Sequence, residues 1–281
     1  MNENSRSADY NFGNIYIWDK HYRQLVCRCG DRMLTKLRYE GKPTFVFPIG
    51  TGPLRPAVEA IREFARFKGY PMTLRGITEA HREMLDKEYP GAFEYSEDVD
   101  CADYIYSAEK LSTYSGKALH GKKNHCNRFE AEHDWDFVPL TRELIPGCLD
   151  MLNMWTEENY ARLDGSIHYE HDAIMRAFAV YEKLGLEGGV LRSGGKIIGF
   201  SMGEMAGRDT FDVHFEKADI DINGAYPMVC RELTRMVMQN HPELVYMNRE
   251  DDMGLESLRT SKLSYKPEFM VRKFTARMRD E

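Results

Sequence analysis

The chain has 281 residues, of which 42% are hydrophobic, 12% aromatic and 30% charged, a composition typical of globular rather than disordered proteins. Its 38 Lys and Arg against 45 Asp and Glu give a net charge of −7, so any nucleic-acid binding must use a local basic patch. No apolar run approaches the ~20 residues of a membrane span, and the polar start shows no signal peptide, so we expect a cytoplasmic protein without a transmembrane segment.

The first half of the chain alternates between strand and helix patterns. Strands are expected at Asn14–Trp18, Leu25–Cys29, Met33–Tyr39, Thr44–Pro48, Met72–Leu74, Phe93–Tyr95 and Tyr104–Tyr106. A helix opened by Pro56 runs to about Lys68, and another spans Thr78–Tyr89. Three further helices are expected at Ser107–Phe129, Thr141–Glu158 and His168–Leu184.

The second half repeats this order. It begins with the strands Val190–Arg192 and Lys196–Met202, which are joined by a Ser-Gly-Gly turn. Strand Thr210–Phe215, a loop at Gly224, a Pro227-opened helix to Asn240, strand Leu244–Asn248 and helix Leu255–Lys262 follow. This recurrence indicates two duplicated α/β domains with a boundary near Glu130–Asp136. A coincidental recurrence of a common βαβ unit is the alternative.

The six cysteines do not suggest a metal or disulfide framework. None forms a Cys-x-x-Cys pair, and we interpret all six as reduced cytosolic thiols. His120, His125 and Cys126 are neighbours, but their spacing fits no common zinc pattern. No metal site is therefore predicted.

A basic segment stands out in this acidic chain. It contains Lys110, Lys117, Lys122, Lys123 and Arg128 with no acidic residue between them. On one continuous helix, Lys110, Lys117, His120, Asn124 and Arg128 would fall within about a quarter of the circumference. Such a stripe suits phosphate groups, whereas the alternative is a solvated basic face that balances acidic neighbours.

Polar residues also gather after the strand that ends at Asn248. Arg249, Glu250, Asp251 and Asp252 follow directly, and ligands of open α/β sheets bind at such strand ends. Arg259 and Lys262 are three residues apart and share a face of the next helix. The alternative is structural: Asp252 caps that helix and Glu256 pairs with Arg259.

The strand Phe211–Glu216 carries three titratable groups on one face. Alternation places Asp212, His214 and Glu216 together, opposite Phe211, Val213 and Phe215. These groups could supply a general base that deprotonates an amine. A solvent-facing edge strand would show the same pattern.

Two separated motifs carry a family resemblance. The first is Ser107-Ala108-Glu109-Lys110-Leu111 with Ser115–His125 and Phe129, and the second is Asn248–Glu250, Asp252, Gly254, Leu258, Arg259, Lys262 and Ser264–Pro267. Together they resemble a bacterial family of unknown function related to the C-terminal synthase domain of phosphatidylglycerol lysyltransferases. The resemblance covers nearly the whole chain. It implies two tandem GNAT-like α/β domains, assigned here to residues 1–133 and 134–281, as in Fem-type transferases.

The resemblance further implies transfer of an aminoacyl group from aminoacyl-tRNA to an amine or hydroxyl acceptor, a small molecule or a lipid headgroup, without a required cofactor. It implies that Glu250, with Asp252 second, acts as the base or recognises the amine. Arg259 and Lys262 would bind phosphate or the developing oxyanion, and Asn248 and Arg249 would bind the substrate. Lys117, His120, Lys122, Lys123, Asn124 and Arg128 would bind the tRNA backbone.

Two alternatives to this activity are retained. One is a GNAT N-acyltransferase that uses acyl-CoA, with Gly224, Ala225 and Tyr226 at the pyrophosphate. The other is a non-catalytic GNAT pair that binds RNA or a small aminoacyl ligand. The membrane lysyltransferases differ from this chain in having a transmembrane half.

Overall fold

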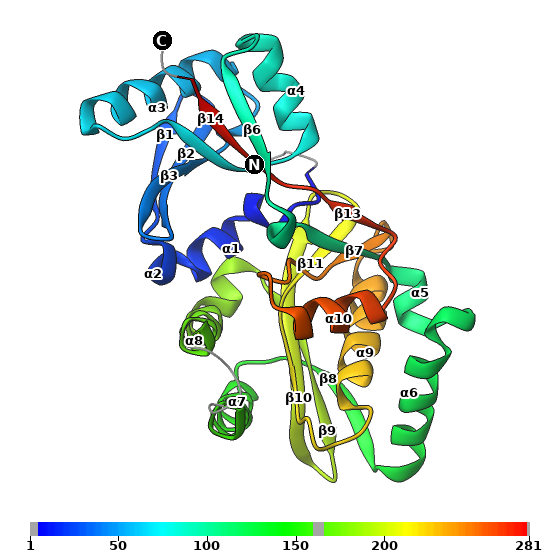
Figure 1. Cartoon of the computed structure of the whole chain (residues 1–281). Helices are drawn as coiled ribbons and strands as arrows, with labels where there is room; N and C mark the ends of the chain where they lie inside the picture. Colours follow the sequence, from blue (N-terminus) through cyan, green and yellow to red (C-terminus); the bar gives the residue numbers. More distant parts are fainter. Residues whose placement is uncertain (1–4, 160–165, 280–281) are drawn as a thin grey trace. The chain divides into compact units, whose positions relative to one another are not determined.

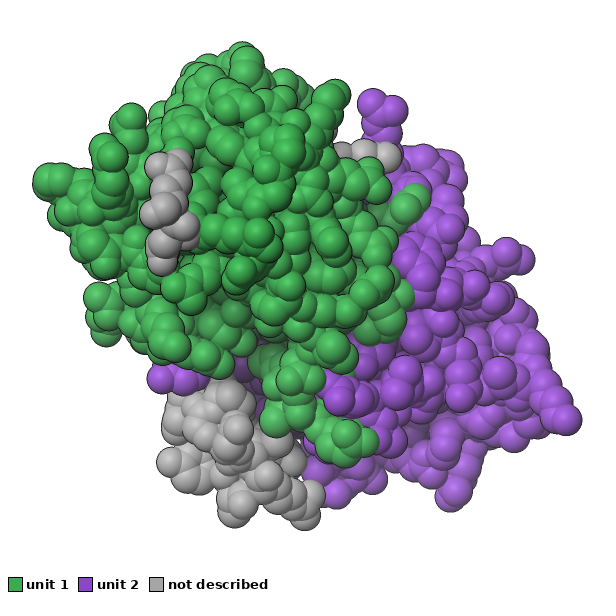
Figure 2. All heavy atoms as spheres, turned by 45° about the horizontal axis from the view of Figure 1, so that its top comes forward, with its two compact units in different colours: residues 1–103, 251–256, 270–281 green, residues 104–250, 257–269 purple. Residues whose placement is uncertain are grey.

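The computed structural model describes residues 5–159 and 166–279 (Figure 1). The chain forms two compact units, which Figure 2 colours separately. Unit 1 contains the described residues up to 103, residues 251–256 and those from 270 onward. Unit 2 contains the described residues from 104 to 250 and residues 257–269. Each unit is built on a β-sheet with packed helices, which confirms the predicted α/β class.

Unit 1 is a mixed sheet with two long helices. Its elements are η1 (Ala8–Tyr10), α1 (Phe12–Ile17), α2 (Asp19–Tyr22), β1 (Leu25–Cys29), β2 (Arg32–Tyr39), β3 (Lys42–Val46), β4 (Ile49–Gly50), α3 (Leu54–Lys68), β5 (Thr73–Ile77), α4 (Glu79–Glu88), β6 (Phe93–Glu97), η2 (Val99–Cys101) and β14 (Phe274–Met278). The strand order is β1-β2-β3-β5-β14-β6, and β4 pairs with β2. The apolar face of α3 is buried in the core of this unit through Ala57, Val58 and Ile61. Thr78 caps α4 by accepting a hydrogen bond from the backbone N–H of His81.

Unit 2 is a sheet with helices on both faces. Its elements are β7 (Asp103–Ser107), α5 (Ala108–Thr113), η3 (Lys117–Leu119), α6 (His120–Glu132), β8 (Trp135–Pro139), α7 (Ile145–Asn159), α8 (Ser166–Leu184), β9 (Glu187–Ser193), β10 (Lys196–Ala206), β11 (Thr210–Ala218), α9 (Ala225–Asn240), β12 (Tyr246–Asn248), α10 (Glu256–Ser264) and β13 (Phe269–Val271). The strand order is β13-β7-β12-β11-β10-β9-β8. In Figure 1, α7 and α8 lie on one side of β8–β11, and α6 and α9 lie on the other.

The predicted repeat is present in both sheets. In unit 1, the parallel strands β3 and β5 flank α3 in sequence, and in unit 2 the parallel strands β11 and β12 flank α9. A parallel pair requires a crossover connection, and a helix supplies it in each unit. In each unit, a glycine-containing loop and a proline near the helix start therefore precede the helix of a βαβ unit.

Each sheet also receives one strand from the other half of the chain. β14 lies between β5 and β6, and β7 lies between β12 and β13. In addition, α5 and α6 pack against α9. The compact units therefore differ from the predicted domains 1–133 and 134–281, because residues 104–133 pack in unit 2 and the last strand pairs in unit 1.

Two expected elements take another form. The range Asn14–Trp18 was expected to be a strand, but it lies in helix α1 and its end. The single helix expected at Ser107–Phe129 is divided into α5, η3 and α6. Tyr114 and Gly116 have positive φ angles of 47° and 88°, which a helix cannot accommodate.

None of the helices in the described part of the chain is both long and apolar enough to cross a membrane.

Candidate functional site

A β-bulge in unit 2 places a histidine where two strands part. β12 pairs with β11 only as far as Asn248 opposite Asp212, so β11 continues without it. On its other side, Met202 of β10 pairs with Phe215 and Gly203 pairs with Val213, so His214 is the extra residue of a bulge. A Cβ at Gly203 would lie 1.8 Å from the carbonyl oxygen of Asp212, so only glycine fits there.

His214 is held by carboxylates from three places in the chain. Its Nδ1 lies 3.0 Å from Oε1 of Glu250 and 3.7 Å from Oδ2 of Asp212. Its Nε2 lies 3.1 Å from Oε1 of Glu204 on β10. The His214 and Asp212 side chains are buried, whereas Glu250 and Glu204 remain 21% and 17% exposed. The two glutamates thus connect a buried imidazole to the surface.

The charges in this cluster favour a protonated imidazole. Burial alone lowers the pKa of His214, but the hydrogen bonds to Glu204 and Glu250 and the charge of Asp212 outweigh it, so the pKa is raised well above its usual value. Both ring nitrogens then donate to carboxylates. One imidazolium facing three carboxylates leaves the cluster negative, which suits a cationic group of a ligand.

Asp212, His214 and Glu250 also offer ligand atoms that lie within 4.8 Å of one another, a grouping that could hold a metal ion. A metal would need a neutral imidazole nitrogen, whereas both nitrogens here are hydrogen-bonded to carboxylates. These contacts favour an ion cluster. That the chain uses no metal stays a prediction.

A second charged group lies beside this cluster. Arg249 Nη2 is 2.7 Å from Oε1 of Glu216, and both side chains are largely buried. The guanidinium lies 4.4 Å from the ring centroid of Tyr265, and Lys122 Nζ lies 3.8 Å from the same centroid. Burial raises the pKa of Glu216, although Arg249, Lys122 and Lys262 act in the opposite direction. Glu216 therefore points at cations rather than at His214.

The backbone after β12 is fixed in an uncommon conformation. Glu250 has φ +54°, and its N–H donates to Oδ1 of the buried Asn248 at 2.6 Å. Lys262 Nζ donates to the carbonyl oxygen of Arg249 at 2.5 Å. A left-handed non-glycine residue persists only where its surroundings enforce it. Here Asn248 and Lys262 hold the turn that presents Glu250 to His214.

The residues predicted for this site divide between the two units. Glu250, Arg249, Asn248 and Lys262 meet in unit 2, whereas Asp252 belongs to unit 1. Asp252 does not cap α10, because it accepts hydrogen bonds from Gly254 and Leu255, and the helix begins at Glu256. Arg259 is half-buried on α10. Lys262 is buried and bound to backbone, so it supports the turn rather than reaching a solvent-borne phosphate.

The predicted basic stripe is only partly present. Lys110 lies on α5 and pairs with Glu268, and Arg128 pairs with Glu132 at 2.8 Å. Lys122 lies on the inward face of α6, and burial followed by Arg249 lowers its pKa. The remaining members, Lys117, His120, Lys123 and Asn124, are exposed on η3 and α6.

The residues predicted for pyrophosphate binding lie at the start of α9, where α6 packs against them. Gly224 has φ +91°, and a Cβ there would lie 2.6 Å from the carbonyl oxygen of His125 on α6 and 3.0 Å from Cβ of Phe129. Ala225 is fully buried and Tyr226 half-buried. Gly224 is therefore explained by close packing of α6 on the start of α9.

The sequence interpretation missed Glu204 and the aromatic partners of Arg249. Glu204 follows Gly203 on a strand whose other residues are mainly apolar, and a lone acid in such a strand was an available signal. Tyr106 and Tyr265 both contact the Arg249 guanidinium, from elements far apart in the chain. No local sequence pattern indicates that these two tyrosines lie beside Arg249.

Comparison with known proteins places the chain in the family that its two motifs resemble. The family described as "Phosphatidylglycerol lysyltransferase, C-terminal" matches residues 2–277. An uncharacterised protein of Mycoplasmoides gallisepticum is 28% identical over 179 residues, which are 63% of this chain and 56% of the relative. The chain thus spans about half the length of that curated relative.

Solved structures show the same fold. A conserved protein of unknown function from Bacteroides thetaiotaomicron is 33% identical, with a TM-score of 0.91 and coverage of 98% of this chain and 92% of that chain. L-PGS from Bacillus licheniformis is 14% identical, with a TM-score of 0.64 and coverage of 97% and 93%. FemX is 8% identical, with a TM-score of 0.63 and coverage of 94% and 90%. The predicted α/β fold is confirmed, and these proteins share it.

Proposed function

Because the chain belongs to the phosphatidylglycerol lysyltransferase C-terminal family, we propose that it is an acyltransferase that transfers an aminoacyl group from aminoacyl-tRNA to an amine or hydroxyl acceptor. The acceptor is a small molecule or a lipid headgroup. The fold shared with L-PGS and FemX supports the transferase class. The observation that carries the proposal is the carboxylate cluster around His214, since this site offers a negative, partly exposed position for an ammonium group.

Glu250 is the residue proposed to handle the proton. An acceptor amine must lose a proton before its nitrogen can attack the ester carbonyl of the donor. Glu250 is partly exposed and fixed by His214 and by the turn at Asn248, so a carboxylate oxygen is held in place to accept that proton. With an amine acceptor the new C–N bond forms as the ester C–O bond breaks, and Glu250 passes the proton taken from the nitrogen to the ribose oxygen, which leaves as a hydroxyl. With a hydroxyl acceptor a new C–O bond forms and the acceptor's proton takes the same route.

His214 is proposed as a positioning residue. As an imidazolium that donates to both Glu204 and Glu250, it fixes the positions of the two carboxylates. Arg259, a half-buried cation on α10, is proposed to stabilise the oxyanion of the tetrahedral intermediate. An aminoacyl ester is already activated, so this reaction needs no cofactor.

The exposed residues of η3 and α6 are proposed to bind the donor backbone. Lys117, His120, Lys123 and Asn124 offer two cations, an imidazole and an amide on one short segment. Such groups contact phosphates without reading sequence. The proposal thus assigns chemistry to the His214 cluster and donor binding to the remainder of the basic stripe.

A deacylation assay over a panel of charged tRNAs with amine and hydroxyl acceptors tests the proposal. The wild-type chain is expected to discharge at least one aminoacyl-tRNA, and Glu250→Gln to lower the rate by about 100-fold or more, the usual contribution of general base catalysis. Glu243→Gln, an exposed acid of the same unit, is the matched control and should retain the wild-type rate. No discharge of any charged tRNA, together with saturable acetyl-CoA binding, would favour the acyl-CoA alternative instead.

A further inference from the structure

Unit 1 contains a small cavity that the proposed transfer reaction does not use. Its volume is about 110 Å³. An engineered cavity of ~150 Å³ accommodates benzene in another protein, so this space fits a molecule of about six or fewer heavy atoms. The residues of α1, α2, β2, β5 and η2 that surround it all belong to unit 1.

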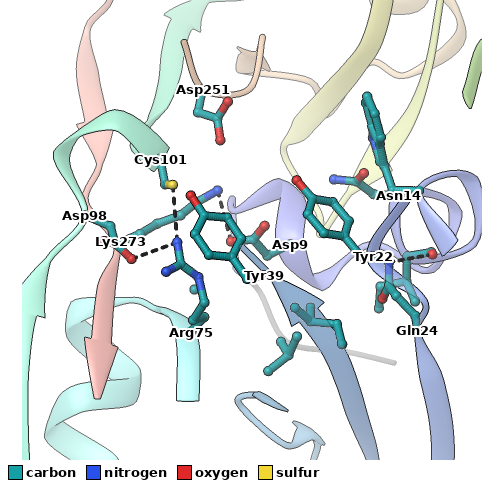
Figure 3. A pocket seen from close by; sticks show the side chains of 15 residues that line it. Asp9, Asn14, Tyr22, Gln24, Tyr39, Arg75, Asp98, Cys101, Asp251 and Lys273 are labelled. Atoms are coloured by element: carbon teal, nitrogen blue, oxygen red, sulfur yellow. Dashed lines mark hydrogen bonds and ion pairs between the residues drawn. The ribbon is translucent and has the colours of Figure 1, made fainter. Parts of the chain in front are cut away.

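One wall of the cavity is aromatic. Trp18, Tyr22 and Tyr39 line it, and Figure 3 shows the two tyrosine side chains beside the carboxylate of Asp9. The Arg75 guanidinium stacks on the Tyr39 ring, 3.4 Å from the ring centroid, so this ring already takes part in one cation–π contact. Burial, followed by the charges of Asp251 and Asp9, raises the pKa of Tyr22, so its ring stays neutral. Neutral aromatic faces attract organic cations.

The charged residues of the lining leave an excess of negative charge. Three carboxylates, Asp9, Asp98 and Asp251, face two cations, Arg75 and Lys273. Arg75 is committed to Asp98, with Nη2 to Oδ2 at 3.1 Å. The lining therefore carries a net charge of −1 before a ligand enters, and a cationic ligand would neutralise it.

Asp9 is held where it can face such a ligand. Its Oδ2 lies 3.0 Å from Nζ of Lys273, and its side chain is still 37% exposed. Gly76 of β5 makes this position possible, because a Cβ there would lie 2.7 Å from the same oxygen. A carboxylate beside neutral aromatic rings is the arrangement that recognises ammonium groups.

We propose that this cavity binds a small primary ammonium ligand of amino-acid size, with the ammonium group between Asp9 and the Tyr39 and Tyr22 rings. The ligand is either a simple amine or the zwitterionic form of an amino acid. In the second case Arg75 faces the ligand carboxylate as well, while its Nη2 keeps the pair with Asp98. The site is independent of the proposed transferase activity, because it is defined by binding alone.

Calorimetric titration of the full-length chain tests this site without an activity assay. Ethanolamine serves as the simple amine, glycine as the zwitterion and acetate as the anion. Saturable binding of ethanolamine or glycine, at a dissociation constant of about 10 mM or tighter, is expected, with no heat from acetate. Glycine binding without ethanolamine binding assigns the zwitterion, and the reverse assigns the amine.

Two variants locate the binding. Asp9→Asn should weaken it at least tenfold, and Tyr39→Leu should weaken it severalfold even if Asp9→Asn fails to fold. Glu94→Gln, an exposed acid of the same unit, is the matched control and should bind as the wild type does. The proposal is overturned if neither amine binds, if acetate binds as well as they do, or if both folded variants bind unchanged.

Discussion

Lys273 and Asp103 form a buried ion pair of 2.7 Å between Nζ and Oδ1 although 170 positions separate them in the sequence. The other carboxylate oxygen of Asp103 accepts a hydrogen bond from the backbone N–H of Ala8. Asp103 thus joins the beginning of the described chain to the segment before its last strand. Both side chains are almost fully buried, so neither charge can be solvated if its partner is removed.

We therefore expect Lys273→Met to destabilise unit 1 strongly. Removing one member of a buried pair leaves an uncompensated charge and costs about 3–5 kcal/mol. Urea unfolding followed by circular dichroism measures the change. Arg279→Met removes an exposed pair with Glu94 and should change the free energy of unfolding by less than ~1 kcal/mol. Equal effects of the two substitutions would contradict the role given to Asp103.

This pair also predicts a dependence on alkaline pH. Burial lowers the pKa of Lys273, but Asp103, Asp9 and Asp251 outweigh it and raise the pKa well above its usual value. A raised pKa means that the stabilisation is complete below the unfolded-state value of about 10.4 and is lost as pH rises through the folded-state value. The difference in stability between the wild type and Lys273→Met should therefore be constant from neutral pH to about pH 10 and should shrink above it.

His214 should remain protonated well above the pH at which a free histidine titrates. Because Glu204, Glu250 and Asp212 raise its pKa, Glu250→Gln should lower that pKa by removing one charge and weakening one hydrogen bond. A pH titration of the imidazole ring protons by NMR measures the value directly. A midpoint near 6.5 in the wild type, unchanged in Glu250→Gln, would show that the carboxylates do not act on the ring.

The His214 cluster shows how far local patterns can predict a site. Alternation on β11 placed Asp212 and His214 on one face, and polar crowding after Asn248 indicated Glu250. Glu204 was not predicted, because its approach depends on the bulge between Met202 and Gly203 and on pairing between strands. Local periodicity describes one strand at a time and cannot supply such a register shift.

The fold was predictable to a similar extent. The βαβ step recurs in the sequence with its proline and glycine signals, and both copies are present around α3 and α9. The exchange of β7 and β14 between the two sheets was not predicted, because both are five-residue strands whose partners lie far away in sequence. The break at Tyr114 was also missed, since a positive φ at a tyrosine has no sequence signal.

Binding of tRNA should depend on salt through the exposed residues of η3 and α6. Lys117→Ala together with Lys123→Ala should weaken binding and reduce the log–log salt slope by about one for each phosphate that the variant no longer neutralises. Lys110→Ala is the control, because Lys110 is paired with Glu268 and lies on another helix. Filter binding across a salt series measures the slope. Equal slopes in the double variant and the wild type would remove the donor-binding role of this segment.

Acetyl-CoA is not expected to bind saturably below about 1 mM. A pyrophosphate needs free backbone N–H groups at a helix start, and the candidate start in unit 2 is that of α9. There α6 packs so closely on Gly224 that a Cβ would lie 2.6 Å from the His125 carbonyl oxygen, and Pro227 lacks an N–H in the first turn. Calorimetry with acetyl-CoA measures the affinity, and binding of charged tRNA by the same preparation controls for its integrity. A micromolar dissociation constant for acetyl-CoA, with no response to any charged tRNA, would reverse the choice of donor.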